Sequence, residues 1–142
     1  MDSKKILNGP ERGGAGVNAL LVLMVLLLIG NAGLNYIPVA YNGASFKEAM
    51  DSAVVKGLAT SGSMKPMDVV KSHVERAMAD NGVPADAVVD IKATNGVVTA
   101  HAAYTQDVDI LPFGIYRYKY EFNHFANPTG YLSSTQSTST KK

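Results

Sequence analysis

The longest uncharged stretch of the chain extends from Gly13 to Phe46, and its centre, Ala19–Ile29, contains only apolar residues. A helix crosses the roughly 30 Å hydrocarbon core of a bilayer with about 20 mostly apolar residues. The segment from Val17 to Val39 has this length, and asparagines are its clearly polar members. We therefore expect one membrane-spanning helix over residues 17–40, preceded by a short cytoplasmic tail of residues 1–16.

Two other interpretations of this segment stay open. A buried helix of a soluble protein can have the same length and composition. A cleavable signal peptide also combines basic residues (Lys4 and Lys5 here), an apolar run and small residues, such as those near Ala32 and Gly33. The apolar pattern continues past Gly33 to Val39, which favours a helix that stays attached.

Charges on the two sides of the span indicate its orientation. Three basic residues precede it, and two follow it closely, Lys47 and Lys56. Loops with an excess of Lys and Arg stay on the cytoplasmic side. We expect a cytoplasmic N-terminus and an extracytoplasmic domain over residues 42–130. Tyr36 and Tyr41 are expected at the membrane–water boundary, where rings with one wet and one dry side gather.

Local signals after the span predict a break and then a new helix. Pro38 should kink or end the first helix because proline lacks the backbone N–H that continues it. Asn42-Gly43 indicates a turn, and Ser45-Phe-Lys-Glu48 has the form of a capping box. We expect a separate helix from about Phe46 to Thr60, with apolar positions repeating every three or four residues.

The next segments predict a second helix and then strands. Met64–Asn81 repeats its apolar residues at helical spacing, with Pro66 in the first turn. After Pro84 the period changes to two, which is typical of a strand. Asn95-Gly96 is a strong signal for a hairpin turn. Counting back from this turn pairs Thr94 with Val97 and Asp90 with His101.

A third strand follows a loop around residues 107–114. Its alternation places four aromatic residues on one face: Tyr116, Tyr118, Tyr120 and Phe122. The sequence therefore predicts an α+β fold: an N-terminal transmembrane helix followed by two helices packed on a three-stranded antiparallel sheet. Residues 131–142 form a Ser/Thr-rich tail.

Composition narrows the classes of function. The chain has no cysteine, which removes disulfides, thiolate metal ligands and a cysteine nucleophile. Its net charge is +1, and the region beyond residue 41 balances acidic and basic residues, so it lacks the basic patch of a nucleic-acid-binding protein. We find no nucleophile motif and no phosphate-binding loop.

Three histidines are the candidates for metal or acid–base chemistry: His73, His101 and His124. Their spacing matches no metal-ligand motif. His124 continues the period of the aromatic face, which predicts a half-buried ring, and His101 would face Asp90 across the hairpin. We expect packing or surface roles for all three, no catalytic residue and no metal.

The later part of the span carries small and amide residues. Gly30 and Gly33 permit close helix approach, and Asn31 and Asn35 lie four apart on one helix face. In lipid, small residues and amides join helices, so we expect these four residues to face a partner helix. Alternatively, the two asparagines lie near the lipid headgroups.

The span has no histidine to bind a haem or chlorophyll metal, and we expect no cofactor. Contact with lipids or pigments stays open.

Several short motifs occur in a recognisable order. Arg12-Gly13 precedes the span, Ile37-Pro38-Val39 ends it, Gly82-Val83-Pro84 precedes the strands, and Leu111-Pro112 precedes the aromatic strand. This order resembles an uncharacterised bacterial family of short single-span membrane proteins, known only as a domain of unknown function. The resemblance covers most of residues 12–125. It implies a membrane-anchored α+β domain, and it implies no activity. We expect the protein in the bacterial inner (cytoplasmic) membrane.

The same Arg12-Gly13 entry and the hydrophobic helix after it are also similar to pilin-like subunits. Those subunits carry a Glu near the helix start that assists assembly, and Asn18 stands at about that place here. The single span with small and amide residues, the neutral domain and the lack of a catalytic motif lead us to expect a non-catalytic accessory or scaffolding subunit. It would bind integral membrane proteins of a larger complex. The alternative is a pilin-like or pseudopilin-like filament subunit, and a metal- or acid–base-dependent enzyme ranks third.

Overall fold

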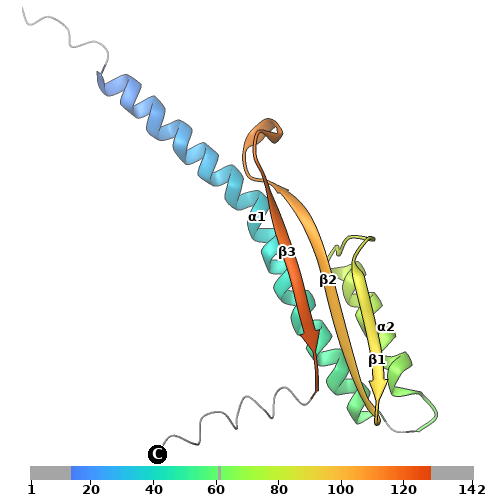
Figure 1. Ribbon diagram of the computed structural model, residues 1–142. Helices are drawn as coiled ribbons and strands as arrows, with labels where there is room; N and C mark the ends of the chain where they lie inside the picture. The colour runs from blue at the N-terminus through green and yellow to red at the C-terminus, as the bar shows by residue number, and fades with distance from the viewer. Residues whose placement is uncertain (1–13, 61, 129–142) are drawn as a thin grey trace, which may run out of the picture.

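The computed structural model describes residues 14–60 and 62–128, and it has an α+β fold (Figure 1). The two helices are α1 (Gly14–Ala59) and α2 (Pro66–Asp80). The strands are β1 (Val88–Thr94), β2 (Val97–Asp109) and β3 (Arg117–Ala126), with a short 3-10 turn at Pro112–Gly114. The predicted fold class is confirmed. The Ser/Thr-rich tail and nearly all of the N-terminal tail lie outside the described residues.

Helix α1 is one continuous helix of 46 residues with Pro38 inside it. The predicted break after the span was therefore wrong, and so were the turn at Asn42-Gly43 and the capping box. Pro38 removes one backbone hydrogen bond from the helix. Farther along the same helix, the side chains of Phe46, Met50 and Val54 are completely buried. Full burial of such side chains stabilises by about 1.5–3 kcal/mol each, so packing outweighs the local signals for a break.

The sheet is antiparallel, with strand order β1-β2-β3. The predicted hairpin turn is confirmed: Asn95 and Gly96 have φ angles of 52° and 78°, the positive values that this turn requires. The predicted register is confirmed too, because Thr94 pairs with Val97 and Asp90 pairs with His101. The opposite end of the sheet carries the β2–β3 connection, beside the point where α1 leaves the domain (Figure 1).

One face of the sheet forms the core with the C-terminal half of α1 and with α2. Alternate residues of β2 point inward, and the rings of Phe46, Tyr104 and Phe122 pack together, with 5.4 Å between the centroids of Phe46 and Phe122. The buried apolar residues of this core are Phe46, Met50, Ala53, Val54, Val70, Val74, Ala77, Val98, Ala100, Ala102, Tyr104, Val108, Phe122 and Ala126. Half of α1 therefore belongs to the domain.

Gly57 allows the two helices to approach closely. A Cβ atom on Gly57 would lie 2.4 Å from Cγ2 of Val70 and 3.3 Å from the carbonyl oxygen of Pro66. Val70 is fully buried and has little room to move. The glycine is therefore a packing requirement at this crossing.

Replacing Gly57 with alanine should destabilise the fold. Overpacking costs roughly 1–3 kcal/mol, and the gain from removing a helical glycine offsets about 0.5–1 kcal/mol of that. Thermal unfolding of the full chain in detergent, followed by circular dichroism, should show a lower midpoint for Gly57→Ala. Gly16→Ala is the matched control, because nothing lies within 4 Å of a Cβ there. An unchanged midpoint for Gly57→Ala would refute the close crossing.

Candidate functional site

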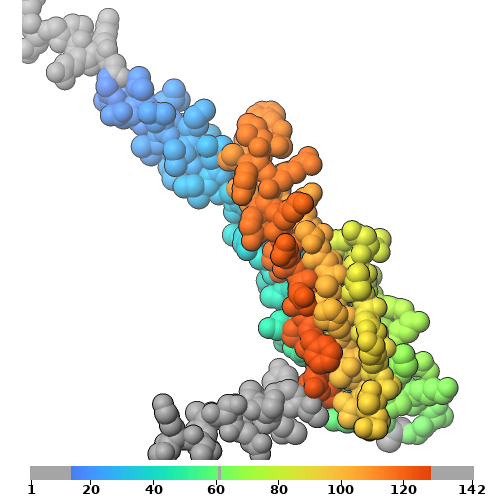
Figure 2. Space-filling model, in the orientation of Figure 1, coloured from blue at the N-terminus to red at the C-terminus, as the bar shows by residue number. Residues whose placement is uncertain are grey.

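The N-terminal half of α1 projects from the domain as an apolar rod (Figures 1 and 2). From Gly14 to Gly30 every residue except the half-exposed Leu28 is exposed. None of its most apolar 18-residue window is buried. This helix is long and apolar enough to cross a membrane, which is compatible with a single-pass membrane protein.

The two asparagines of the span bond to the end of strand β2. Asn31 Nδ2 donates to the carbonyl oxygen of Ile110 over 3.1 Å, and Asn35 Nδ2 donates to that of Asp109 over 2.8 Å. If this segment crosses a membrane as predicted, each amide would be costly without a hydrogen-bond partner. These bonds therefore explain how a largely apolar segment holds two asparagines. They also fasten the helix to the β2–β3 connection.

The glycines beside these asparagines have free space around them. Nothing lies within 4 Å of a Cβ built on Gly30, and at Gly33 the nearest atom is Cδ1 of Ile37 in the next turn, at 3.7 Å. The predicted partner helix at this face stays a prediction. The geometry assigns the amides to contacts within the chain and leaves the glycine face open.

The two tyrosines predicted at the membrane boundary differ in their surroundings. The ring of Tyr36 meets the rings of Tyr118 and Tyr120, with centroids 5.8 and 6.4 Å apart. Burial, with the neighbouring Tyr36 and Tyr118, raises the pKa of Tyr120. Tyr41 is 72% exposed. The domain therefore contacts α1 from Asn31 onward, well before the predicted domain boundary at residue 42, and the membrane level of both tyrosines stays a prediction.

The histidines occupy three separate places. His124 is half-buried, as its period predicted, and its Nε2 lies 2.8 Å from Oδ1 of Asp51 on α1. Sequence reasoning missed this pair, because the two residues are 73 positions apart. The contact ties β3 to α1, and a carboxylate in this position can orient an imidazole ring.

His101 lies on the open face of the sheet and His73 on α2. Although Asp90 pairs with His101 in register, the His101 ring contacts Oδ1 of Asn123 at 2.9 Å, and Asp90 forms an ion pair with Lys92 instead. Within residues 14–60 and 62–128, no three His, Cys, Asp or Glu residues gather closely enough to hold a metal ion.

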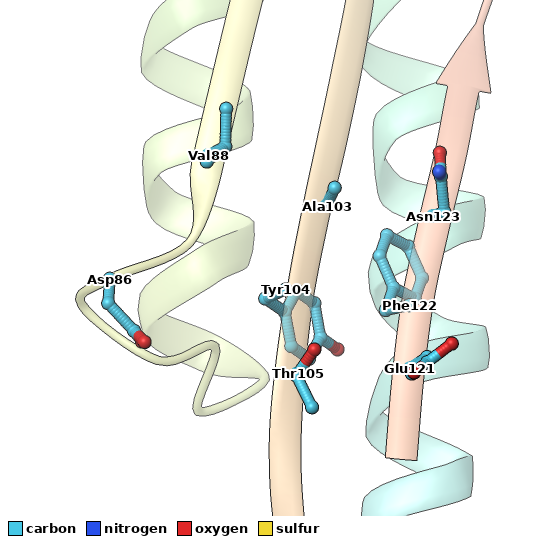
Figure 3. Close-up of a pocket in the computed structure, with 8 residues that line it drawn as sticks. All are labelled: Asp86, Val88, Ala103, Tyr104, Thr105, Glu121, Phe122 and Asn123. Atoms are coloured by element: carbon cyan, nitrogen blue, oxygen red, sulfur yellow. The ribbon is translucent and has the colours of Figure 1, made fainter. Parts of the chain in front are cut away.

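A shallow depression of about 400 Å³ lies across the strands, beside the start of β1 (Figure 3). Its lining comes from the loop before β1 and from all three strands: Asp86, Val88, Ala103, Tyr104, Thr105, Glu121, Phe122 and Asn123. Burial, with the neighbouring Tyr120, raises the pKa of Tyr104. The lining holds two carboxylates and no basic side chain, so it is not built to bind an anion.

Comparison with known proteins finds no match for this chain among family models, curated proteins or solved structures.

Proposed function

We propose that the protein is a non-catalytic, single-span accessory or scaffolding subunit of a larger protein complex in the bacterial inner membrane. Its N-terminus is cytoplasmic and its α+β domain lies in the periplasm or outside the cell. Its partners are integral membrane proteins that contact the span through the glycine face of α1.

The continuity of α1 is the observation that carries this proposal. Its first half is an exposed apolar rod, and its second half supplies Phe46, Met50 and Val54 to the core of the domain. No flexible linker separates the two halves. A partner that fixes the rod in the membrane therefore also fixes the height and direction of the domain, which is the property expected of a scaffold.

The glycine face is the surface proposed for the partner helix. Small residues let two helices approach closely in lipid, where packing rather than the hydrophobic effect joins them. Gly30 offers open space, and the bonds of Asn31 and Asn35 hold the rod in one rotation relative to the sheet. The partner thus meets the same face of the helix in every copy.

We predict that Gly30→Leu will weaken the binding of partner proteins without unfolding the chain. The leucine has room within the chain but would separate a closely packed partner helix. Native purification from membranes, with mass identification of the co-migrating proteins, should show a loss of partners of roughly tenfold or more, as expected for a contact worth about 1.4 kcal/mol. Gly16→Leu is the control, since it also has free space and lies at the other end of the rod. Full retention of partners by Gly30→Leu would exclude this interface.

A pilin-like filament subunit is the second candidate function. The observation that favours it is the exposed rod itself, which rods of identical chains could cover in a helical assembly. The same purification separates the candidates. Different large membrane proteins beside the chain support the accessory subunit, whereas a polymer of this chain alone supports the filament.

A further inference from the structure

The β2–β3 connection ends in an uncharged apolar tip. We call Ile110–Tyr116 the hairpin tip. Asp109 and Arg117 flank it and form an ion pair with each other, with their closest atoms 2.8 Å apart. Phe113 is 98% exposed, Ile115 is 73% exposed and Tyr116 is 53% exposed. Backbone bonds from Ile110 and Leu111 to the carbonyl oxygen of Tyr116 close the tip. Large apolar side chains that gather on an exposed surface indicate a contact site for another molecule.

The backbone of Phe113 adds a second observation. Its φ and ψ angles are 64° and 16°, a left-handed conformation that bulky residues rarely adopt. Conformations of this kind cost of order 1–3 kcal/mol and concentrate at functional positions. Because the ring is almost fully exposed, packing within the described chain cannot offset that cost. The tip therefore presents an aromatic ring outward from a defined turn.

The position of the hairpin tip beside α1 indicates which surface the tip contacts. Asn31 and Asn35 bond to the carbonyl groups of Ile110 and Asp109, so the tip lies at the level of these two residues. In Figures 1 and 2 the β2–β3 connection stands beside α1 where the projecting rod begins. The exposed apolar residues of the tip and of the rod therefore project from the same end of the domain.

The length of the rod sets the level of the bilayer surface. Gly14–Gly30 is about 17 residues and roughly 25 Å long at 1.5 Å per residue, and Glu11 and Arg12 limit it on the N-terminal side. A hydrocarbon core about 30 Å thick therefore extends some 5 Å beyond Gly30, to about Leu34. This is the level at which the hairpin tip contacts the helix.

We propose that the hairpin tip is a second membrane-binding site, which inserts Phe113 and Ile115 into the outer lipid boundary beside the span. Tyr116, Tyr118 and Tyr36 then lie at the headgroup level that aromatic rings favour, and Arg117 reaches the phosphates. The domain is fixed to the membrane at two points and cannot tilt freely relative to the bilayer. This proposal rests on the single span proposed above.

Tryptophan fluorescence tests the insertion directly, because the chain has no tryptophan of its own. Phe113→Trp in the full chain is reconstituted into vesicles of phosphatidylcholine, either plain or brominated near the headgroup end of its acyl chains. We expect the brominated lipid to remove roughly half or more of the emission, since an interfacial group lies about 5–10 Å deep. Phe125→Trp is the matched control: Phe125 is also exposed, but lies roughly 27 Å farther along β3, and its emission should be unchanged.

Leu23→Trp separates the failure of the tip from the failure of the span. Lipid brominated near the chain ends should quench this variant most strongly. If Leu23→Trp is quenched and Phe113→Trp matches the Phe125→Trp control, the tip proposal is wrong and the span stands. If neither is quenched, both are wrong. A blue-shifted but unquenched emission from Phe113→Trp would mean that protein covers the tip, and would also overturn the proposal.

Discussion

Phe46→Ala should destabilise the domain by about 3–5 kcal/mol, the range for removing a buried phenylalanine ring. Phe46 is 0% exposed and packs against the rings of Tyr104 and Phe122, so its removal leaves a cavity where α1 meets two strands. Domains are stable by only about 5–15 kcal/mol in total. Unfolding of the full chain in detergent, measured by circular dichroism, should therefore show a large fall in the midpoint.

Phe125→Ala is the control for this experiment. It removes the same ring from a side chain that is 57% exposed and lies at the far end of β3 from the hairpin tip, so the midpoint in detergent should stay nearly unchanged. Equal effects of the two substitutions would contradict the assignment of the C-terminal half of α1 to the core.

Arginines at Leu23 and Leu27 should release the chain from the membrane. Both side chains are exposed on the projecting rod. Each arginine near the centre of a span costs about 2.5–3.5 kcal/mol for insertion. The double variant therefore loses roughly 5–7 kcal/mol of insertion free energy. After alkaline extraction, we expect most of it in the soluble fraction and the unchanged protein in the membrane pellet.

Val55→Arg with Leu58→Arg is the matched control in the same helix. Both residues are exposed and apolar, but they lie in the half of α1 that packs on the sheet. The control should stay with the membrane. A Leu23→Arg and Leu27→Arg variant that pellets as completely as this control would show that the rod does not lie in lipid.

The elements that the sequence predicted correctly depend on neighbouring residues. Asn95-Gly96 adopts positive φ angles at low cost, and this turn alone sets the register that pairs Asp90 with His101. Pro66 and the stripe through Val70 and Val74 likewise predicted α2 from adjacent positions. Signals of this kind can be read without knowledge of the rest of the fold.

The features that could not be predicted from the sequence depend on contacts between distant segments. The break predicted after Tyr41 relied on Pro38 and the capping box, but the sheet buries Phe46 and Met50 and keeps α1 continuous. The acceptors of the span asparagines lie 79 and 74 positions away. In the sequence, Asn31 and Asn35 are simply two amides in an apolar run. Only the fold brings the end of β2 beside them and so determines which atoms they bond.

Cysteine labelling tests the central claim, that α1 spans the membrane with its first half and carries the domain with its second. The chain has no cysteine of its own, so Leu23→Cys and Val88→Cys each carry one thiol at an exposed position. A membrane-impermeant maleimide added to intact spheroplasts should label Val88→Cys and leave Leu23→Cys unlabelled until detergent dissolves the bilayer. Labelling of Leu23→Cys as fast as Val88→Cys in intact spheroplasts, or protection of Val88→Cys until lysis, would contradict the account.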